Sequence, residues 1–297
     1  MKIRIPILVS IGILAVGLIL GSFFDLQIAQ GIFSENNGFG IFIAAFSFIP
    51  GYAFISIVGG LLFASAYKSN KPKWLKVFLY LCSVIAIICA TYFSGNEIFS
   101  FNGYYHEGIG YTLLGCGICL VIQTAVGFLG FYLFKDNKNE NLWLPALIIT
   151  FAIVIALVPI TQIAKIVMDR PRYRLIQTNF YDLRFYNWFE RCTNAKGYIA
   201  LGANKEDFKS FPSGHAGTAV LIPILFSTLI PVARPNLRKY SSLFYYIGFA
   251  YVLVVMFARM LVGAHFLSDV CIGALVVVVL FYIANEIILR KNLFKFE

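Results

Sequence analysis

The sequence predicts an all-α integral membrane protein, a bundle of about eight transmembrane helices. Of its 297 residues, 60% are hydrophobic and only 13% are charged, whereas a soluble domain has about 25% charged residues. The apolar residues gather in long stretches close to the ~20 residues that cross a bilayer. Aromatic residues make up 17% of the chain, and a composition this rich in aromatic and apolar residues excludes intrinsic disorder.

Eight apolar stretches are long enough to span a membrane. The first follows Lys2 and Arg4 but lacks a clear small-residue cleavage site, so we expect a retained helix and no cleaved signal peptide. Single prolines such as Pro159 are tolerated inside bundled spans. The stretches lie near 6–24, 41–67, 77–93, 111–134, 143–164, 212–233, 243–258 and 270–289.

The distribution of Lys and Arg predicts the orientation, because cytoplasmic loops carry an excess of these residues. The two termini and every second connection between them hold fourteen of the 24 cations. We therefore expect both termini in the cytoplasm of a multi-pass cell membrane protein. The remaining connections hold ten, and nine of these lie in 165–211. The cations stand between apolar runs and form no continuous basic face, so no nucleic-acid partner is expected.

The connection 165–211 is the only long one and concentrates positive charge on the predicted outer side. Part of it has apolar side chains at helical spacing, which predicts a short helix lying in the membrane interface. Such a helix would act either as a lid over the helix ends or as a gate for a lipid substrate. The residues concerned are Tyr181, Phe185, Trp188, Phe189 and Cys192.

Ionisable residues near a bilayer are costly, about 2.5–3.5 kcal/mol at mid-span, so those that persist usually pair or take part in chemistry. The first cluster contains Lys165 and Arg172, which are seven residues apart. A continuing helix would place both cations on one face. Pro171 disfavours helix at the preceding residue, so this geometry is approximate.

A second cluster, Pro212 to His215, starts the sixth span. Backbone N–H groups at a helix start attract phosphate, and Ser213 would cap the helix, donate to an anion, or do both. A third cluster contains Arg259, His265 and Asp269. A carboxylate one helical turn from an imidazole can set its tautomer, which makes the other ring nitrogen a nucleophile or base, although a structural ion pair has the same spacing.

The small number of histidines and their positions favour a catalytic role for two of them. The chain has only three histidines, and two of them, His215 and His265, fall in clusters assigned to the same membrane face. The third, His106, is expected in a solvated loop.

The three clusters resemble the motifs of the type 2 phosphatidic acid phosphatase superfamily, which includes the haloperoxidases. The family pattern is Lys-x6-Arg-Pro, Pro-Ser-Gly-His and Ser-Arg-x5-His-x3-Asp, and the resemblance covers roughly 143–289. Tyr173 replaces the Pro of the first motif and Ala258 the Ser of the third. Because the family core has six spans, the resemblance implies a phosphatase core over 77–297, with motifs in 165–269, and two additional helices in 1–76.

The resemblance also implies the activity: a metal-independent phosphatase, without a cofactor, that hydrolyses a lipid phosphate or diphosphate at the outer face through a phosphohistidine. His265 would attack phosphorus, Asp269 would orient its ring, and His215 would protonate the leaving oxygen. The phosphate-binding residues would be Lys165, Arg172, Ser213, Gly214 and Arg259.

Three other functions remain open at this stage. A lipid phosphotransferase would use the same phosphohistidine with an alcohol as acceptor. An anion transporter would use the cations without chemistry, although transporters usually show internal repeats and none is evident here. A haloperoxidase is less favoured, because nothing in a membrane-embedded chain calls for vanadate.

Overall fold

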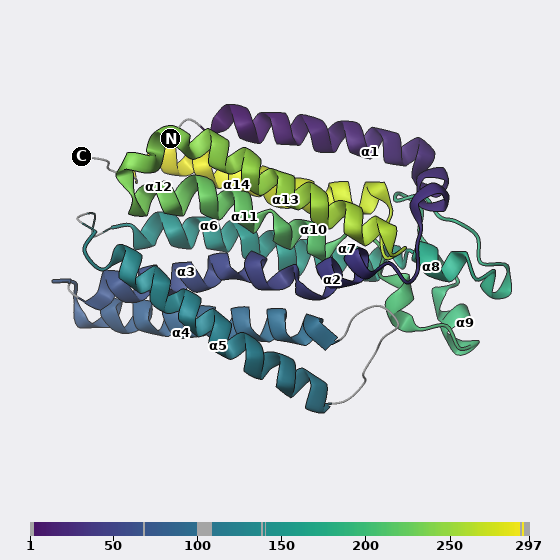
Figure 1. The fold of residues 1–297 in the computed structure, drawn as a ribbon, viewed down its shortest axis with the longest axis horizontal. Coiled ribbons are helices and arrows are strands. Elements are labelled where there is room, and N and C mark those ends of the chain that lie inside the picture. The colour runs from purple at the N-terminus through teal and green to yellow at the C-terminus, as the bar shows by residue number, and fades with distance from the viewer. Residues whose placement is uncertain are drawn as a thin grey trace.

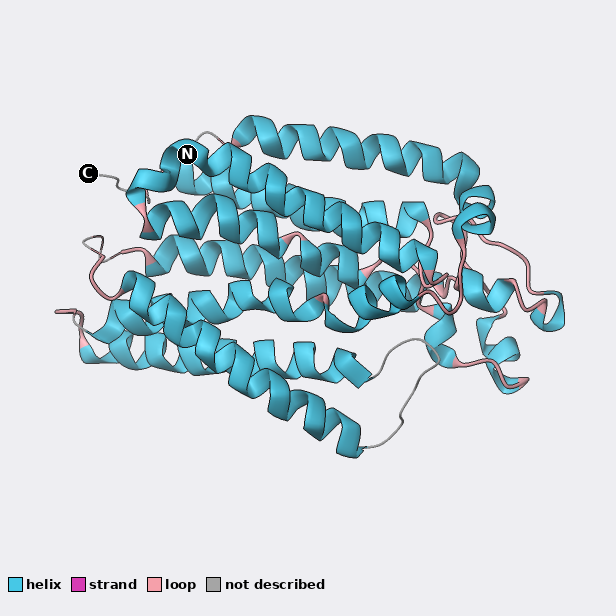
Figure 2. Cartoon of the chain, viewed as in Figure 1, coloured by secondary structure: helices cyan, strands magenta, loops and turns pink. Residues whose placement is uncertain are grey.

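The structure is a computed structural model that describes residues 3–67, 69–99, 109–137, 139, 141–291 and 293. Within these ranges the chain forms helices and no strand (Figure 2). In the described part of the chain, eight helical segments are long and apolar enough to cross a membrane, and each overlaps one of the predicted stretches. The prediction of an all-α, multi-span bundle is therefore confirmed. His106 lies outside the described residues.

Several spans are built from more than one helix. In chain order the spanning helices are α1 (Arg4–Ile32), α2 (Gly38–Phe46) with α3 (Phe48–Tyr67), α4 (Lys73–Phe99), α5 (Ile109–Phe134), α6 (Trp143–Ile155) with η1 (Ala156–Ile160) and α7 (Thr161–Met168), α10 (Gly214–Ala219) with α11 (Leu221–Ile224), η4 (Leu225–Leu229) and α12 (Ile230–Ala233), α13 (Ser241–Leu261) and α14 (Leu267–Arg290). The remaining short elements are α8 (Tyr173–Ile176), η2 (Phe180–Asp182), α9 (Ala195–Ala200), η3 (Lys205–Phe208) and η5 (Pro235–Tyr240).

The bundle is organised around the span that begins with α10. In the most apolar part of Gly214–Ala233, 83% of the residues are buried, against 22% for Arg4–Ile32. Helices α3, α4 and α5 pack together on one side of this central span, and α1 packs along α14 on the other (Figure 1). Motif residues at the start of α10 are consequently surrounded by protein.

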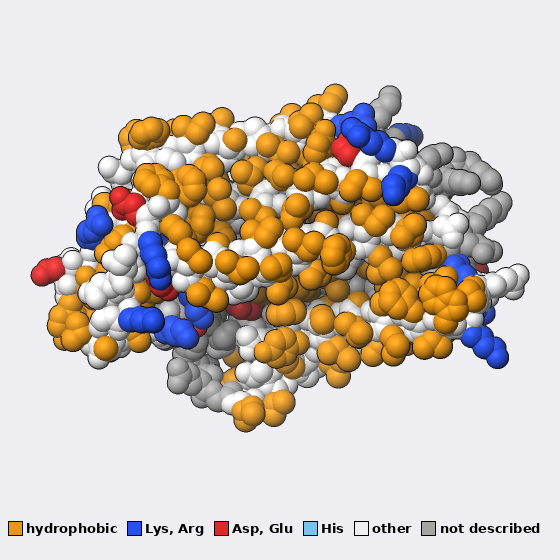
Figure 3. All heavy atoms as spheres, turned by 180° about the vertical axis from the view of Figure 1, so that it is seen from behind, with side chains coloured by type: hydrophobic (Ala, Val, Ile, Leu, Met, Phe, Trp, Pro, Cys, Tyr) orange, Lys and Arg blue, Asp and Glu red, His pale blue; other side chains and the backbone are white. Residues whose placement is uncertain are grey.

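The two ends of the bundle differ. Both chain termini lie at one end, and α8 and α9 of the cationic connection lie at the opposite end (Figure 1). Hydrophobic side chains cover the middle of the molecule, while charged side chains gather mainly towards the ends (Figure 3). This distribution suits a bilayer around the middle of the bundle.

Two spans differ from their predicted form. Helix α1 continues to Ile32, eight residues beyond the predicted end, and so includes Asp25. The fifth span contains the π-helical turn η1 at Pro159, which lacks a backbone donor. The hydroxyl of Thr161 donates to the Ala156 carbonyl at 2.8 Å and so satisfies one backbone group at this turn.

The predicted interfacial helix does not form. Tyr181 and Asp182 have positive φ angles of 44° and 55°, which end the helical path after a single turn. The segment that follows is irregular and is held by polar contacts to α1: the Trp188 indole donates to the Ser22 hydroxyl, and the Asn187 amide donates to the Ser22 carbonyl, both at 2.9 Å. Residues 183–192, called the strap below, are therefore an irregular segment that Trp188 anchors to α1. The helical spacing of the aromatic residues wrongly predicted a helix.

Candidate active site

The three sequence clusters meet at the end of the bundle opposite the termini. Each contributes from a helix terminus: Lys165 from the last turn of α7, His215 from the first turn of α10 and Arg259 from the last turn of α13. Arg172 precedes α8, and His265 lies in the connection between α13 and α14. Arg172, Arg259, His215 and His265 are all buried, with at most 9% of each residue exposed.

His265 is held as a neutral imidazole. Its Nδ1 is 2.5 Å from the Ser210 carbonyl oxygen, which can only accept, so Nδ1 carries the proton and Nε2 keeps its lone pair. Burial, together with the positive charges of Arg259, Arg172 and Lys165, lowers the pKa of His265 well below the usual value of 6.5. The neutral, nucleophilic form therefore predominates at neutral pH.

The partner of the His265 ring differs from the predicted one. Within the part of the chain that the structure describes, Asp269 makes no hydrogen bond with His265. Its Oδ2 accepts from the Ser210 hydroxyl at 2.5 Å and from the Phe266 N–H at 2.8 Å. The i, i+4 spacing fails because α14 begins only at Leu267, so His265 precedes the helix. Asp269 thus reaches the ring through Ser210.

His215 is enclosed by residues that sequence reasoning missed. Its Nε2 lies 3.1 Å from the Ala44 carbonyl of α2 and 3.8 Å from the Glu97 carboxylate of α4. Its ring stacks on Phe48 with centroids 4.2 Å apart. Glu97 also interacts electrostatically with Arg259, Lys165 and Arg172. A carboxylate at the end of an otherwise apolar helix was the available signal for Glu97.

Ser213 and Gly214 form the start of the central span. The Ser213 hydroxyl accepts from the Ala216 N–H at 3.4 Å, which is the capping role, and its own proton remains available to donate. A Cβ placed at Gly214 would lie 3.7 Å from the Lys165 Nζ, so the first and second motifs adjoin. The Ser213 N–H donates to the Asp269 carbonyl at 3.0 Å, which joins the second motif to the third.

Lys165 and Arg172 do not share the face of one helix as predicted. Helix α7 ends at Met168, because Asp169 adopts the left-handed conformation with φ 46°. The chain then turns back, and the Arg172 N–H donates to the Asp207 carbonyl at 2.7 Å. Both cations nevertheless act on His265 electrostatically, so they lie near the same ring although the predicted helical geometry was wrong.

The charges of the site suit a bound oxyanion. In the described part of the chain, no group of three or more His, Cys, Asp or Glu side chains is arranged to hold a metal ion. Three cations and a neutral imidazole instead surround one buried region, where electrostatic interactions are stronger than in water. Such an arrangement can bind a phosphoryl group and present a nitrogen nucleophile to it.

The fold and site define a multi-pass membrane protein with a buried, cation-rich cluster at one end of its bundle. The family of the chain follows from its C-terminal half: residues 145–292 match the PAP2 superfamily, and the chain belongs to this superfamily. Members of the superfamily are generally phosphatases. Searches with the chain find no significant match among curated protein sequences or solved structures.

Proposed function

We propose that the protein is a metal-independent lipid phosphate phosphatase that acts through a phosphohistidine at the non-cytoplasmic face of the membrane. The observation that carries this proposal is the state of His265: a neutral ring with Nδ1 bonded to a carbonyl and Nε2 unprotonated, in the field of three cations. Within a family whose members are generally phosphatases, a phosphoryl group is the expected electrophile for this nitrogen.

In the first half of the reaction, Nε2 of His265 attacks phosphorus while the bond to the leaving oxygen breaks. Lys165, Arg172 and Arg259 neutralise the equatorial oxygens, and the Ser213 hydroxyl and Gly214 N–H donate to them. Hydrogen bonds to charged groups contribute about 1.5–3 kcal/mol each, so this set supplies substantial transition-state stabilisation without a metal. In the second half, water attacks the phosphohistidine and frees phosphate.

His215 serves as the acid in the first half and the base in the second. It gives a proton to the leaving oxygen and later takes one from the attacking water, so the proton balance closes over the cycle. The Glu97 carboxylate lies 3.8 Å from Nε2 of this ring. Because Nε2–H faces the Ala44 carbonyl, Nδ1–H is the donor left for the leaving oxygen.

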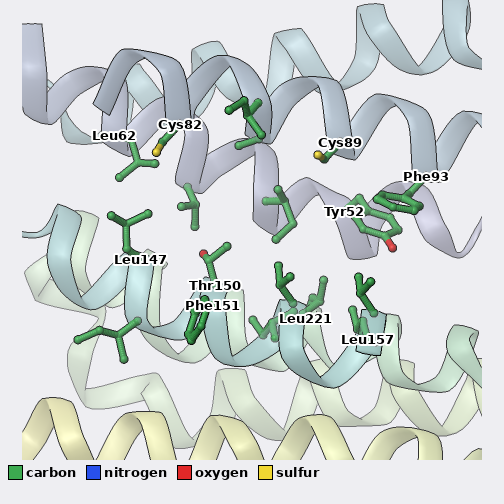
Figure 4. Close-up of a pocket in the computed structure, with 18 residues that line it drawn as sticks. Tyr52, Leu62, Cys82, Cys89, Phe93, Leu147, Thr150, Phe151, Leu157 and Leu221 are labelled. Atoms are coloured by element: carbon green, nitrogen blue, oxygen red, sulfur yellow. The ribbon is translucent and has the colours of Figure 1, made fainter. Parts of the chain in front are cut away.

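An apolar groove supports a substrate with a hydrocarbon chain. It has a volume of about 790 Å³ and lies between α3, α4 and the span formed by α6 and η1 (Figure 4). Tyr52 and Phe93 line one end of it. Tyr52 stacks on Phe93 and contacts Phe48, which stacks on His215, so a continuous row of aromatic rings links the groove to the site.

The length of the groove matches one leaflet of a bilayer. On α4 its lining runs from Cys82 through Cys89 to Phe93, and Glu97 of the site follows one turn later. At ~1.5 Å per residue, the eleven steps from Cys82 to Phe93 span about 16 Å, close to the ~15 Å depth of half a hydrocarbon core. A lipid with its phosphate beside His215 would fit its chain into this groove.

Purified protein is expected to release inorganic phosphate from lipid phosphates in excess EDTA. The test is a panel containing a polyprenyl diphosphate, phosphatidate, phosphatidylglycerol phosphate and a phosphorylated glycolipid, with an added alcohol as competing acceptor. Phosphate release from none of them would contradict the proposal. Transfer to the alcohol in place of release would establish the phosphotransferase, and phosphate flux into liposomes without hydrolysis would establish the transporter.

Filling the groove should separate long-chain from short-chain substrates. Cys89→Trp places an indole among the lining side chains, so we expect kcat/KM for a long-chain lipid phosphate to fall roughly 10-fold or more, as when about 1.4 kcal/mol of binding energy is lost. The value for a short-chain analogue should change less than about 2-fold. Val121→Trp on α5, where Val121 is 72% exposed and does not line the groove, is the control. Equal losses for both substrates would refute the assignment.

A further inference from the structure

Helix α1 carries a buried carboxylate that the proposed reaction does not explain. The helix lies on the outside of the bundle (Figure 1), precedes the region matched by the family, and turns exposed apolar residues such as Ile5 and Phe23 outward. Its inward stripe includes Ser10, Gly21 and Asp25. Asp25 is only 1% exposed, and a carboxylate at such a position is costly unless it is paired and hydrogen-bonded.

The partner of Asp25 is Arg170, a fully buried residue between Lys165 and Arg172 of the first motif. Its Nη2 lies 3.0 Å from Asp25 Oδ2, and its Nη1 lies 2.5 Å from Asp269 Oδ1. Its Nε donates to the Tyr186 carbonyl at 2.9 Å, and its guanidinium carbon lies 4.3 Å from the centre of the Phe266 ring. One guanidinium therefore joins a carboxylate of α1 to a carboxylate of the third motif.

Asp25 also holds the start of α14. Its Oδ1 accepts from the Ser268 N–H at 3.0 Å, and its Oδ2 accepts from the Ser268 hydroxyl. The first N–H groups of a helix lack intrahelical partners and attract negative charge. The residue before α14 is Phe266, whose side chain has no acceptor, so α1 supplies a capping carboxylate from outside the helix.

A short chain of contacts leads from this cluster to the reactive ring. Asp269 accepts from the Ser210 hydroxyl, and the Ser210 carbonyl faces Nδ1 of His265, both at 2.5 Å. The Ser210 N–H donates to the Arg170 carbonyl at 3.0 Å. A shift of Arg170 would therefore move the Asp269 carboxylate and the Arg170 carbonyl, the two groups that determine where Ser210 lies. A displaced Ser210 would change the orientation and the tautomer of His265.

We propose that Asp25 is a positioning residue of the active site, which acts through Arg170, Asp269 and Ser210 on the ring of His265. This inference rests on the proposed function, because it assigns His265 as the reacting group. It makes the first helix, which the family resemblance leaves outside the six-helix core, a part of the catalytic apparatus. The ordinary alternative is that Asp25 only attaches α1 to the bundle.

The test compares Asp25→Asn with Ser10→Ala. Ser10 lies on the same stripe, is 1% exposed, and its hydroxyl lies 2.8 Å from the Tyr245 hydroxyl of α13, so Ser10→Ala weakens the docking of α1 without touching the cluster. For Asp25→Asn we expect kcat to fall roughly 10- to 100-fold through misplacement of the ring, with KM changed less than about 3-fold because the phosphate-binding cations remain. Ser10→Ala should keep both constants, and Asp25→Glu should restore part of kcat.

A readout without turnover separates this inference from the proposed function. With ¹⁵N-labelled histidine the chain gives ring signals from only three residues, so the tautomer of His265 can be followed directly. Asp25→Asn should change the His265 signals and Ser10→Ala should not. If the wild-type protein cleaves no lipid phosphate, the proposed function is wrong. The ¹⁵N signals would still show whether Asp25 determines the tautomer of His265.

A second variant allows the same test if Asp25→Asn does not fold. A Cβ at Gly21 would come within 2.7 Å of the Ser268 nitrogen and 2.8 Å of Asp25 Oδ1, so Gly21→Ala should disturb the same contact while keeping its charges. It should reproduce the loss of kcat and the altered His265 signals. Wild-type kcat and unchanged His265 signals in folded Asp25→Asn or Gly21→Ala protein would overturn the proposal.

Discussion

Replacing His265 with Ala is expected to lower phosphate release by about 10⁴-fold or more, a loss typical of removing a reacting group. The reason is that, in the proposed reaction, the Nε2 lone pair, left unprotonated by the Nδ1 bond to Ser210, forms the covalent bond to phosphorus. The variant should also lose the acid-labile phosphoenzyme. Rapid quenching with a ³²P-labelled lipid phosphate, followed by gel analysis at alkaline pH, measures both effects.

Two further histidine variants serve as controls for this experiment. His215→Ala should slow formation of the phosphoenzyme more than it changes substrate binding, because it removes the proposed acid and leaves the proposed nucleophile. His106→Ala removes the histidine outside the three motifs and should retain normal turnover. Normal turnover of His265→Ala would show that the reaction does not proceed through this residue.

Replacing Arg170 with Met is expected to destabilise the protein by about 3–5 kcal/mol, the usual cost of leaving buried charge uncompensated. The side chains of Asp25 and Asp269 are both 0% exposed and both pair with Arg170. Without the guanidinium, two carboxylates would face one another in a dry interior. The midpoint of thermal unfolding in detergent measures the loss.

Arg4→Met is the matched control. Arg4 pairs with Glu286 at 2.6 Å, but 54% of its side chain is exposed, and exposed ion pairs contribute little because water and salt screen them. Its unfolding midpoint should stay close to that of the wild type. The triple variant Arg170→Met, Asp25→Asn, Asp269→Asn should recover part of the lost stability, since it removes the stranded charges. Similar midpoints for the two single variants would disprove a stabilising role for the buried cluster.

Much of the fold could be predicted because membrane insertion depends on local composition. Whether a stretch such as 111–134 crosses a bilayer follows from the summed transfer free energies of its own residues, and the structure places a spanning helix on each predicted stretch. The motif clusters could be predicted for a related reason. Lys165, His215 and Arg259 stand at the ends of apolar runs, and helices that cross the same membrane have their ends at a common depth.

The hydrogen-bond partners within the site could not be predicted in this way. The spacing of His265 and Asp269 indicated a direct contact, yet the ring bonds to Ser210, 55 residues away along the chain. Asp25 and Arg170 are separated by 145 residues, and no local pattern connects them. Similarly, the spacing of aromatic residues in 181–192 indicated a helix, but contacts to Ser22 hold the segment in an irregular form.

The local sequence thus specifies which segments enter the membrane and which charged residues gather at one end of the bundle, because each segment's hydropathy and charge are properties of its own residues. The choice of neighbour for each buried polar group depends on how distant helices pack. A buried carboxylate or imidazole must find partners or lose several kcal/mol, and α1, α14 and the strap after α8 supply those partners only once they are assembled.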